Sequence, residues 1–224
     1  MSVGYFEGYN WDRPCLNMEA SDIVASSAAF PYTHVHFAFA NLTEDYEVDI
    51  GDQEVQFQLF LDATGFKKIL SFGGWAFSTD PSTYNIFREG VTEANRITLA
   101  ENIVDFVSAN GLDGVDIDWE YPGEPDIPGI PAGSALDGIN YLVFLQELRE
   151  LLPSTATLSI TAPSSFYYLQ AFYLYETSQV VDYIVFMTYD LHGQWDYGNE
   201  WTNPGCPTGN CLRSHGTYRE AKGL

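Results

Sequence analysis

The sequence "DGVDIDWEYP", residues 113–122, alternates apolar and polar residues as a half-buried β-strand does. It nevertheless carries four acidic residues within eight positions, although Asp and Glu are depleted in strands. Because successive side chains of a strand point to opposite faces, Asp116, Asp118 and Glu120 are predicted to share one face. The apolar residues between them share the other face, where we expect covering helices.

Three carboxylates on one face indicate acid–base chemistry. Like-charge repulsion and desolvation both raise the pKa of a buried carboxyl, so Asp116, Asp118 and Glu120 should share at least one proton. A carboxyl that stays protonated near neutral pH suits general acid catalysis. The alternative interpretation is an edge strand with a solvated acidic face, which requires neither the apolar opposite face nor the Pro122 that follows.

Strand-like and helix-like segments alternate along the chain. Helical patterns occupy residues 97–107, which end at Asn110-Gly111, and residues 139–152, which follow a predicted N-cap at Asp137 and end at Pro153. Strands are predicted at residues 3–9, 34–40, 68–75, 114–120, 157–163 and 182–190.

This alternation predicts an α/β fold with a parallel sheet, either an open doubly wound sheet or a (β/α)8 TIM barrel. No predicted strand is followed by G-x-G-x-x-G or G-x-x-x-x-G-K, so a nucleotide-binding sheet loses support. Polar and aromatic residues gather at the C-terminal strand ends, where barrel active sites are built. The alternation stops after Asp190, and residues 191–224 are predicted to form a long loop excursion.

The composition limits the classes of partner. The 224-residue chain has a formal net charge of -22 and only nine Lys and Arg residues. Nucleic acid and anionic membrane surfaces are therefore poor partners, whereas a neutral polysaccharide is indifferent to this field. No apolar run is long enough to span a bilayer, and strand-like sequence begins at Val3 without a secretory signal before it.

The three cysteines are Cys15, Cys206 and Cys211, so at least one thiol has no partner within the chain. The segment "GCPTGNC" brings two of them close together, and no second Cys/His pair follows at zinc spacing. We therefore expect a disulfide between Cys206 and Cys211 rather than a zinc site. A disulfide implies an oxidising compartment.

Three motifs resemble those of family 18 glycoside hydrolases, the chitinase family. "DGVDIDWE" matches the D-x-x-D-x-D-x-E signature at all four acidic residues, Asp113 included. "SFGG" at residues 71–74 resembles the S-x-G-G motif of the third strand, and "MTYD" at residues 187–190 resembles the M-x-Y-D motif of the sixth. "GYFEGYNWDRPCLNM" and "PGCPTGNCLRSH" resemble the fungal branch that contains large secreted chitinases and the chitinase-like alpha subunit of yeast killer toxin.

The resemblance implies retaining hydrolysis of β-1,4 links between N-acetylglucosamine units, with the substrate's acetamido group as the nucleophile. It implies that Glu120 protonates the glycosidic oxygen and later acts as a base. Asp118 accepts the acetamido N–H, Asp116 shares a proton with Asp118, and Tyr189 donates to the acetamido oxygen. The implied substrate-binding residues are Gly74, Trp75, Tyr121, Met187 and Asp190.

The resemblance implies no cofactor and no metal, with chitin or chito-oligosaccharides as the partner and endo action favoured. It also implies that the full-length parent is secreted and carries additional chitin-binding modules. Two alternatives share the scaffold: a chitin-binding lectin or toxin-targeting module, and an endoglycosidase acting on glycoproteins. The acid of the signature, Glu120, is retained, which favours an enzyme.

The match departs from the family at its end. A family barrel has eight strands and a Trp on the last one, whereas six strands are predicted here and none follows Tyr189. Residues 1–224 are therefore expected to form a single catalytic barrel domain that is truncated after the sixth strand, and the activity of this length of chain is in doubt.

Overall fold

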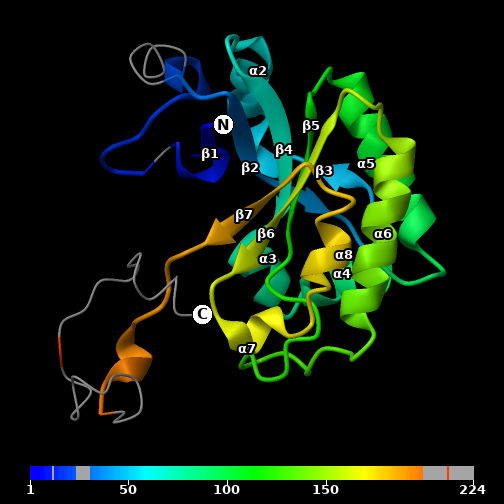
Figure 1. The fold of residues 1–224 in the computed structure, drawn as a ribbon. Coiled ribbons are helices and arrows are strands. Elements are labelled where there is room, and N and C mark those ends of the chain that lie inside the picture. The colour runs from blue at the N-terminus through cyan, green and yellow to red at the C-terminus, as the bar shows by residue number, and fades with distance from the viewer. Residues whose placement is uncertain (12, 24–30, 199–210, 212–224) are drawn as a thin grey trace.

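The computed structural model describes residues 1–11, 13–23, 31–198 and 211. At its centre lies a curled sheet of seven strands with the spatial order β1-β2-β4-β5-β6-β7, in which neighbours are parallel (Figure 1). The short β3 pairs antiparallel with β2. The strands are β1 (Val3–Glu7), β2 (His34–Leu42), β3 (Val48–Asp49), β4 (Lys67–Gly73), β5 (Gly114–Asp118), β6 (Thr157–Pro163) and β7 (Tyr183–Met187).

Apart from β3, the strands lie in space in the order in which they occur in the chain. A doubly wound sheet reverses its strand order at a switch point, whereas a barrel adds each strand beside the preceding one. The observed order therefore decides between the two predicted arrangements in favour of the barrel. Within the described residues the barrel is incomplete, because β1 and β7 are the two ends of the sheet.

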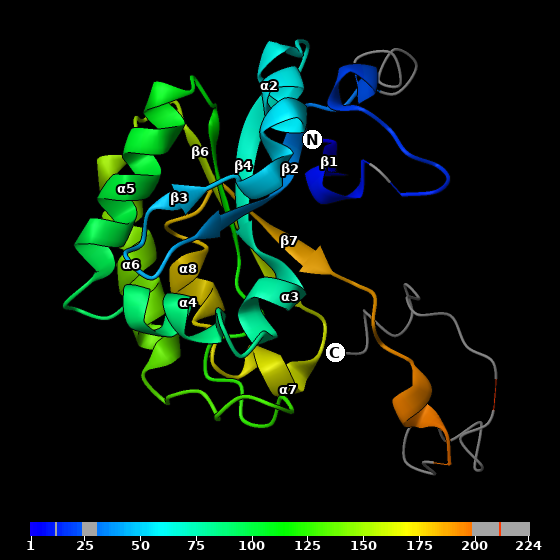
Figure 2. The same ribbon diagram turned by 180° about the vertical axis from the view of Figure 1, so that it is seen from behind.

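Helices cover the sheet on one side, and the two longest, α5 and α6, lie side by side there in both views (Figures 1 and 2). The α-helices are α2 (Glu54–Asp62), α3 (Gly74–Thr79), α4 (Tyr84–Gly90), α5 (Arg96–Ala109), α6 (Asp137–Leu151), α7 (Phe166–Leu169) and α8 (Leu174–Thr177). Short 3-10 turns are η1 (Gly8–Asn10), η2 (Ala20–Asp22), η3 (Gly51–Gln53) and η4 (Gln194–Asp196).

All six predicted strands and both predicted helices are present, with differences at their ends. Strand β5 ends at Asp118, so Glu120 lies two residues beyond it, and β7 ends at Met187. Asp137 is the first residue of α6 rather than its N-cap. Its Oδ2 accepts the backbone N–H groups of Ser134 and Gly123, at 2.9 and 3.1 Å, because the loop before the helix folds back over it.

The apolar face of β5 packs beneath the helices, as predicted. Ile117 is fully buried, and Trp119 just beyond the strand retains 2% of its exposure. The Trp119 ring lies between Phe87 of α4 and Tyr141 of α6, with ring centroids 5.7 and 5.3 Å away. Full burial of a large apolar side chain stabilises a fold by about 1.5–3 kcal/mol, so this contact anchors the end of the strand.

Most of the predicted excursion at residues 191–224 lies outside the described residues, and so does Cys206. Cys15 is exposed with a free thiol, and Cys211 is disulfide-bonded. The prediction that one thiol lacks a partner is confirmed. In the described part of the chain, no helix has both the length and the apolar character needed to cross a bilayer.

We predict that residues 1–224, produced alone, will not behave as a stable monomer. The outer edges of β1 and β7 are unpaired within the described residues, and apolar edges template aggregation. Tyr5 and Phe186 on these strands are 37% and 43% exposed. Apolar surface that stays exposed to water costs about 25 cal/mol per Å². The net stability of a folded domain is only about 5–15 kcal/mol, so two exposed edges can cancel much of it.

Size-exclusion chromatography and calorimetry of residues 1–224 test the prediction. We expect aggregation or a broad unfolding transition. A monomeric protein with a sharp cooperative transition would contradict the prediction.

Candidate active site

The predicted carboxylates converge at the C-terminal end of β5, on the concave face of the sheet. Asp116 is fully buried, Asp118 retains 5% exposure, and Glu120 is partly buried. Tyr189, two residues beyond β7, lies close enough to both Asp118 and Glu120 for their charges to act on it. The structure therefore brings the four predicted catalytic residues together. It places them where barrel active sites are built.

Asp116 is surrounded by hydrogen-bond donors from other strands. Its Oδ2 accepts the Tyr5 hydroxyl at 2.9 Å and the Ser71 hydroxyl at 2.7 Å, and its Oδ1 accepts the Ser159 hydroxyl at 2.6 Å. The His36 Nδ1 lies 3.2 Å from Oδ2. Burial alone would raise the pKa of Asp116, but the His36 charge and the hydrogen bonds outweigh it and lower that pKa.

Asp118 has a different environment although only one residue separates it from Asp116. Its Oδ1 accepts the Thr161 hydroxyl at 2.5 Å. Burial and the neighbouring Glu120 raise the pKa of Asp118 well above its usual range, and the Thr161 hydrogen bond opposes them only in part. The two aspartates of one strand therefore shift in opposite directions.

Glu120 is held by its backbone, since its N–H donates to the buried Ser78 hydroxyl at 3.0 Å. Burial raises the pKa of Glu120 to about 7, with a further contribution from the charge of Asp190. A carboxyl with such a pKa is protonated in a large fraction of molecules at neutral pH and can donate a proton. The pKa values of both Asp118 and Glu120 are raised, and the sharing of a proton between carboxylates stays a prediction.

Two glycines leave space beside these carboxylates. Gly73 ends β4 with φ +105°, and a Cβ there would lie 2.2 Å from the backbone oxygen of Asp118. Gly74 begins α3 with φ +80°, and a Cβ there would lie 2.7 Å from the Phe39 ring. Both positions therefore require glycine, for conformation and for close approach.

Aromatic rings continue outward from the carboxylates. Trp75 is 52% exposed, and its ring centroid lies 6.5 Å from that of Tyr121. Tyr121 stacks on Tyr168 at 4.6 Å, and Tyr168 contacts Tyr167 edge-on at 5.3 Å. These side chains follow β4, β5 and β6 in turn, so they form a row along the C-terminal edge of the sheet.

Tyr167 and Tyr168 were not among the predicted site residues. Both lie on α7, in the segment "SFYYL" that begins two residues after β6. They line a cavity of about 170 Å³ together with residues 122–125, Gln170 and Ala171. The gathering of polar and aromatic residues at the C-terminal strand ends is a signal that could have found them.

The segment after β7 completes the predicted site. Met187 is buried at the end of the strand, whereas Tyr189 is 53% exposed. Burial and the charges of Asp118 and Glu120 raise the pKa of Tyr189 to about 12, so its phenol is a hydrogen-bond donor at neutral pH. Asp190 has φ +54°, a conformation that Asp tolerates better than most residues.

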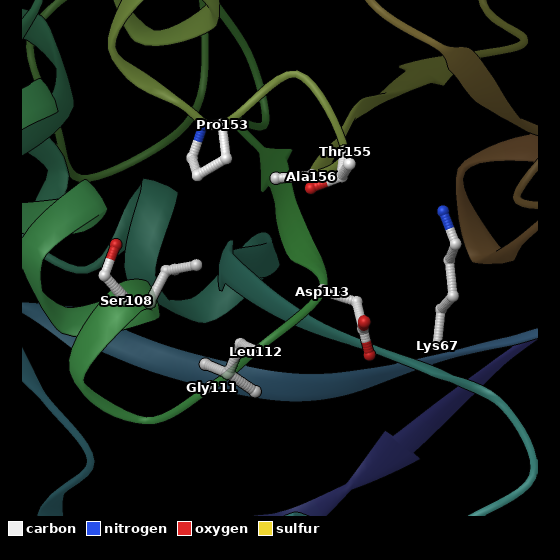
Figure 3. A pocket seen from close by; sticks show the side chains of 9 residues that line it. Lys67, Ser108, Gly111, Leu112, Asp113, Pro153, Thr155 and Ala156 are labelled. Carbon is white, nitrogen blue, oxygen red and sulfur yellow. The ribbon is translucent and has the colours of Figure 1, made fainter.

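A second cavity of about 680 Å³ opens at the opposite, N-terminal ends of the strands (Figure 3). Lys67, Ser108 and Thr155 are among the residues that line it, together with Asp113. The Asp113 Oδ2 accepts the Lys68 backbone N–H at 2.8 Å, which is a structural role. Residues at the N-terminal face of a barrel serve stability, whereas active sites are built at the C-terminal face. We therefore place the active site at the C-terminal ends of the strands.

Within the part of the chain that the structure describes, no group of three or more His, Cys, Asp or Glu side chains is arranged to hold a metal ion.

The family model "Glycosyl hydrolases family 18" matches residues 1–214. "Secreted chitinase LysM12" of Penicillium expansum is 52% identical over 223 residues, which are 99% of this chain and 14% of that protein. "Killer toxin subunits alpha/beta" of Kluyveromyces lactis is 50% identical over 179 residues, 80% of this chain and 15% of that protein. The chain thus spans about a seventh of the length of these relatives.

Solved structures give the same picture of the fold. Catalytic domain 2 of the group II chitinase from Ostrinia furnacalis superposes with a TM-score of 0.76 at 26% identity, covering 88% of this chain and 52% of that one. Chitinase ChiA74 from Bacillus thuringiensis superposes with a TM-score of 0.71 at 26% identity, covering 87% of this chain and 41% of that one.

We predict that Gly73→Ala destabilises the protein more than Gly65→Ala. Both glycines have similar φ values, +105° and +100°, but a Cβ at Gly65 would meet nothing within 4 Å. Gly65→Ala therefore measures the conformational strain alone, about 1–3 kcal/mol. Gly73→Ala adds a clash with the Asp118 backbone. Thermal unfolding of the two variants checks this, and equal losses would contradict it.

Proposed function

Because the chain belongs to glycosyl hydrolase family 18, we propose that the protein hydrolyses the β-1,4 links between N-acetylglucosamine units of chitin, with retention and with assistance from the substrate. One observation carries the proposal: Glu120, whose pKa burial raises to about 7, lies beside Asp118 on the concave face and within reach of Tyr189. The three side chains would supply an acid, a counter-charge and a phenol donor.

In the proposed first step, Glu120 donates its proton to the glycosidic oxygen as the C–O bond breaks. Asp118 and Glu120 interact strongly enough to titrate as a pair. When their proton lies on Glu120, Asp118 is an anion and accepts the acetamido N–H. Its charge then offsets the positive charge that develops on the sugar ring.

The acetamido carbonyl oxygen is the proposed nucleophile, so the substrate replaces the second carboxylate of an ordinary retaining glycosidase. The Tyr189 phenol, protonated at neutral pH, donates to that oxygen and holds it for attack on the anomeric carbon. Glu120, now ionised, removes a proton from the water that opens the cyclic intermediate. Asp118 and Tyr189 thus each act on an atom that is present only in an N-acetylated sugar.

Gly74, Trp75, Tyr121, Met187 and Asp190 are the proposed substrate-binding residues. The glycine leaves room for a sugar ring, and the exposed Trp75 presents an apolar face on which a pyranose can stack. The row of rings that continues through Tyr121 to Tyr168 supports a saccharide chain as the ligand rather than a single sugar.

We also propose that the protein acts outside the cell and that the natural product carries further chitin-binding modules. A relative named as a secreted chitinase and the disulfide at Cys211 support the first point. A lectin or toxin-targeting module is the second candidate, supported by the killer toxin relative. The partly buried Glu120, whose pKa is raised, favours the enzyme, since binding alone has no need of such a group.

We predict that Glu120→Gln removes hydrolysis and leaves binding to chitin intact. Losing the general acid should lower turnover by at least the roughly 10²–10⁴-fold typical of such groups. Hydrolysis of a chromogenic chito-oligosaccharide and a chitin pull-down measure the two properties in the natural gene product. The matched control is Glu101→Gln, at an exposed position of α5; turnover of Glu120→Gln within tenfold of that control would remove Glu120 from the acid's role.

We predict that hydrolysis requires the N-acetyl group. Asp118 and Tyr189 are assigned to an acetamide, and a hydroxyl at the same carbon offers no nucleophilic carbonyl oxygen. Rates on chitin oligomers should exceed those on cellulose oligomers of equal length by orders of magnitude. Comparable rates on the two substrates would refute the substrate-assisted mechanism while leaving a general glycosidase possible.

A further inference from the structure

A fully buried histidine faces the catalytic carboxylates from β2. His36 has no exposed surface, and its two ring nitrogens both lie close to polar groups. Nδ1 lies 3.2 Å from the Asp116 Oδ2, and Nε2 lies 2.7 Å from the Tyr183 hydroxyl on β7. The ring also packs against Tyr5 with centroids 4.5 Å apart. None of the catalytic roles proposed above is assigned to this side chain.

The two contacts determine where the imidazole proton lies. If His36 is cationic, both nitrogens carry a proton. If it is neutral, the Tyr183 hydroxyl can donate to Nε2, which leaves the proton on Nδ1. The remaining tautomer would aim the Nδ1 lone pair at the Asp116 carboxylate, which is repulsive. Nδ1 therefore presents an N–H to Asp116 in either favourable state.

This N–H adds to three hydroxyls that already contact Asp116. Tyr5 and Ser71 share Oδ2 with His36, and Ser159 contacts Oδ1. An ionised carboxylate offers about four lone-pair sites, so these donors occupy its acceptor capacity. A protonated Asp116 would direct an O–H at one of the donors and lose that contact. The surroundings thus favour the anion of Asp116 over its acid.

We propose that His36, held by Tyr183, is a positioning residue that keeps Asp116 ionised throughout the reaction and thereby confines the transferable proton to Asp118 and Glu120. The inference rests on the proposed function for its catalytic meaning. It departs from the expectation that Asp116 shares a proton with Asp118. The fixed negative charge of Asp116 instead makes Asp118 hold its proton until Glu120 takes it.

Several other titratable groups face His36 and Asp116. Tyr5 from β1, Tyr183 from β7 and Tyr141 from α6 all have pKa values that burial raises, so they stay neutral across the working range. Asp118 follows on β5. His34, on the same strand as His36, packs against the Tyr183 ring, and its Nδ1 contacts the Thr33 hydroxyl at 2.9 Å. β4 contributes the Ser71 hydroxyl.

The experiment compares His36→Leu, which removes the donor, with His36→Gln, which retains an N–H donor. His34→Leu is the matched control, because it lies two residues along the same strand and also contacts Tyr183 but not Asp116. The pH dependence of kcat/KM on a chito-oligosaccharide is measured for the natural gene product and each variant. A merely structural loss lowers the rate equally at every pH.

We expect His36→Leu to move the acid limb of the profile to higher pH by about one to two units, the size of shift that a neighbouring opposite charge produces in a carboxyl pKa. The sign follows because an Asp116 with fewer donors takes up a proton at higher pH, and this extra proton blocks Asp118. His36→Gln should return the acid limb most of the way to its wild-type pH. His34→Leu should leave the position of the limb unchanged. An unmoved limb in His36→Leu overturns the proposal.

A second readout does not depend on turnover. Infrared difference spectra between low and neutral pH, with Asp116→Asn identifying the band, report the protonation of Asp116 directly. We expect the Asp116 band to titrate at higher pH in His36→Leu than in the wild type, and identical titration would overturn the proposal. If the wild type fails to hydrolyse chito-oligosaccharides, the proposed function is wrong and the spectra still decide the role of His36.

Discussion

The buried carboxylate of Asp116 connects all six parallel strands of the sheet. Moving an ionised carboxylate out of water costs several kcal/mol, and each hydrogen bond to a charged group returns about 1.5–3 kcal/mol. Donors from β1, β2, β4 and β6 meet on this one group, and β7 holds the imidazole among them. The sheet has to curl for Tyr5 to reach a carboxylate 111 residues later in the chain.

The same burial gives two neighbouring aspartates different chemistry. Asp116 is surrounded by donors and stays an anion, whereas Asp118 has one hydroxyl contact and the charges of Asp116 and Glu120 nearby. Desolvation acts on both, so the neighbouring charges decide the direction of each pKa together with the hydrogen-bond donors: His36 lowers that of Asp116, and Glu120 raises that of Asp118. Asp116 thus supplies a fixed negative charge, and the neighbouring Asp118 carries a proton, so the two aspartates have different roles.

Much of this arrangement could be predicted from the sequence, because alternation and strand-end motifs are local signals. The six strands and both long helices were found in that way, and the alternation also predicted that Asp116, Asp118 and Glu120 share one face, whereas the role of Tyr189 came from the resemblance. The donors around Asp116 could not be predicted, since His36 and Ser159 come from separate strands and read as ordinary strand residues. The end of β5 at Asp118 and the loop that folds over Asp137 also depend on tertiary contacts that no local pattern encodes.

The carboxylates point where they do because of packing on the other side of the sheet. Trp119 lies between Asp118 and Glu120 in the sequence and packs outward between Phe87 and Tyr141. Anchoring this large ring fixes the backbone on both sides of it, so the two carboxyls must face inward. The close approach of Gly73 to the Asp118 backbone then sets how near β4 comes to the site. Apolar packing outside the sheet thereby positions polar chemistry inside it, and the strand's alternation makes both possible at once.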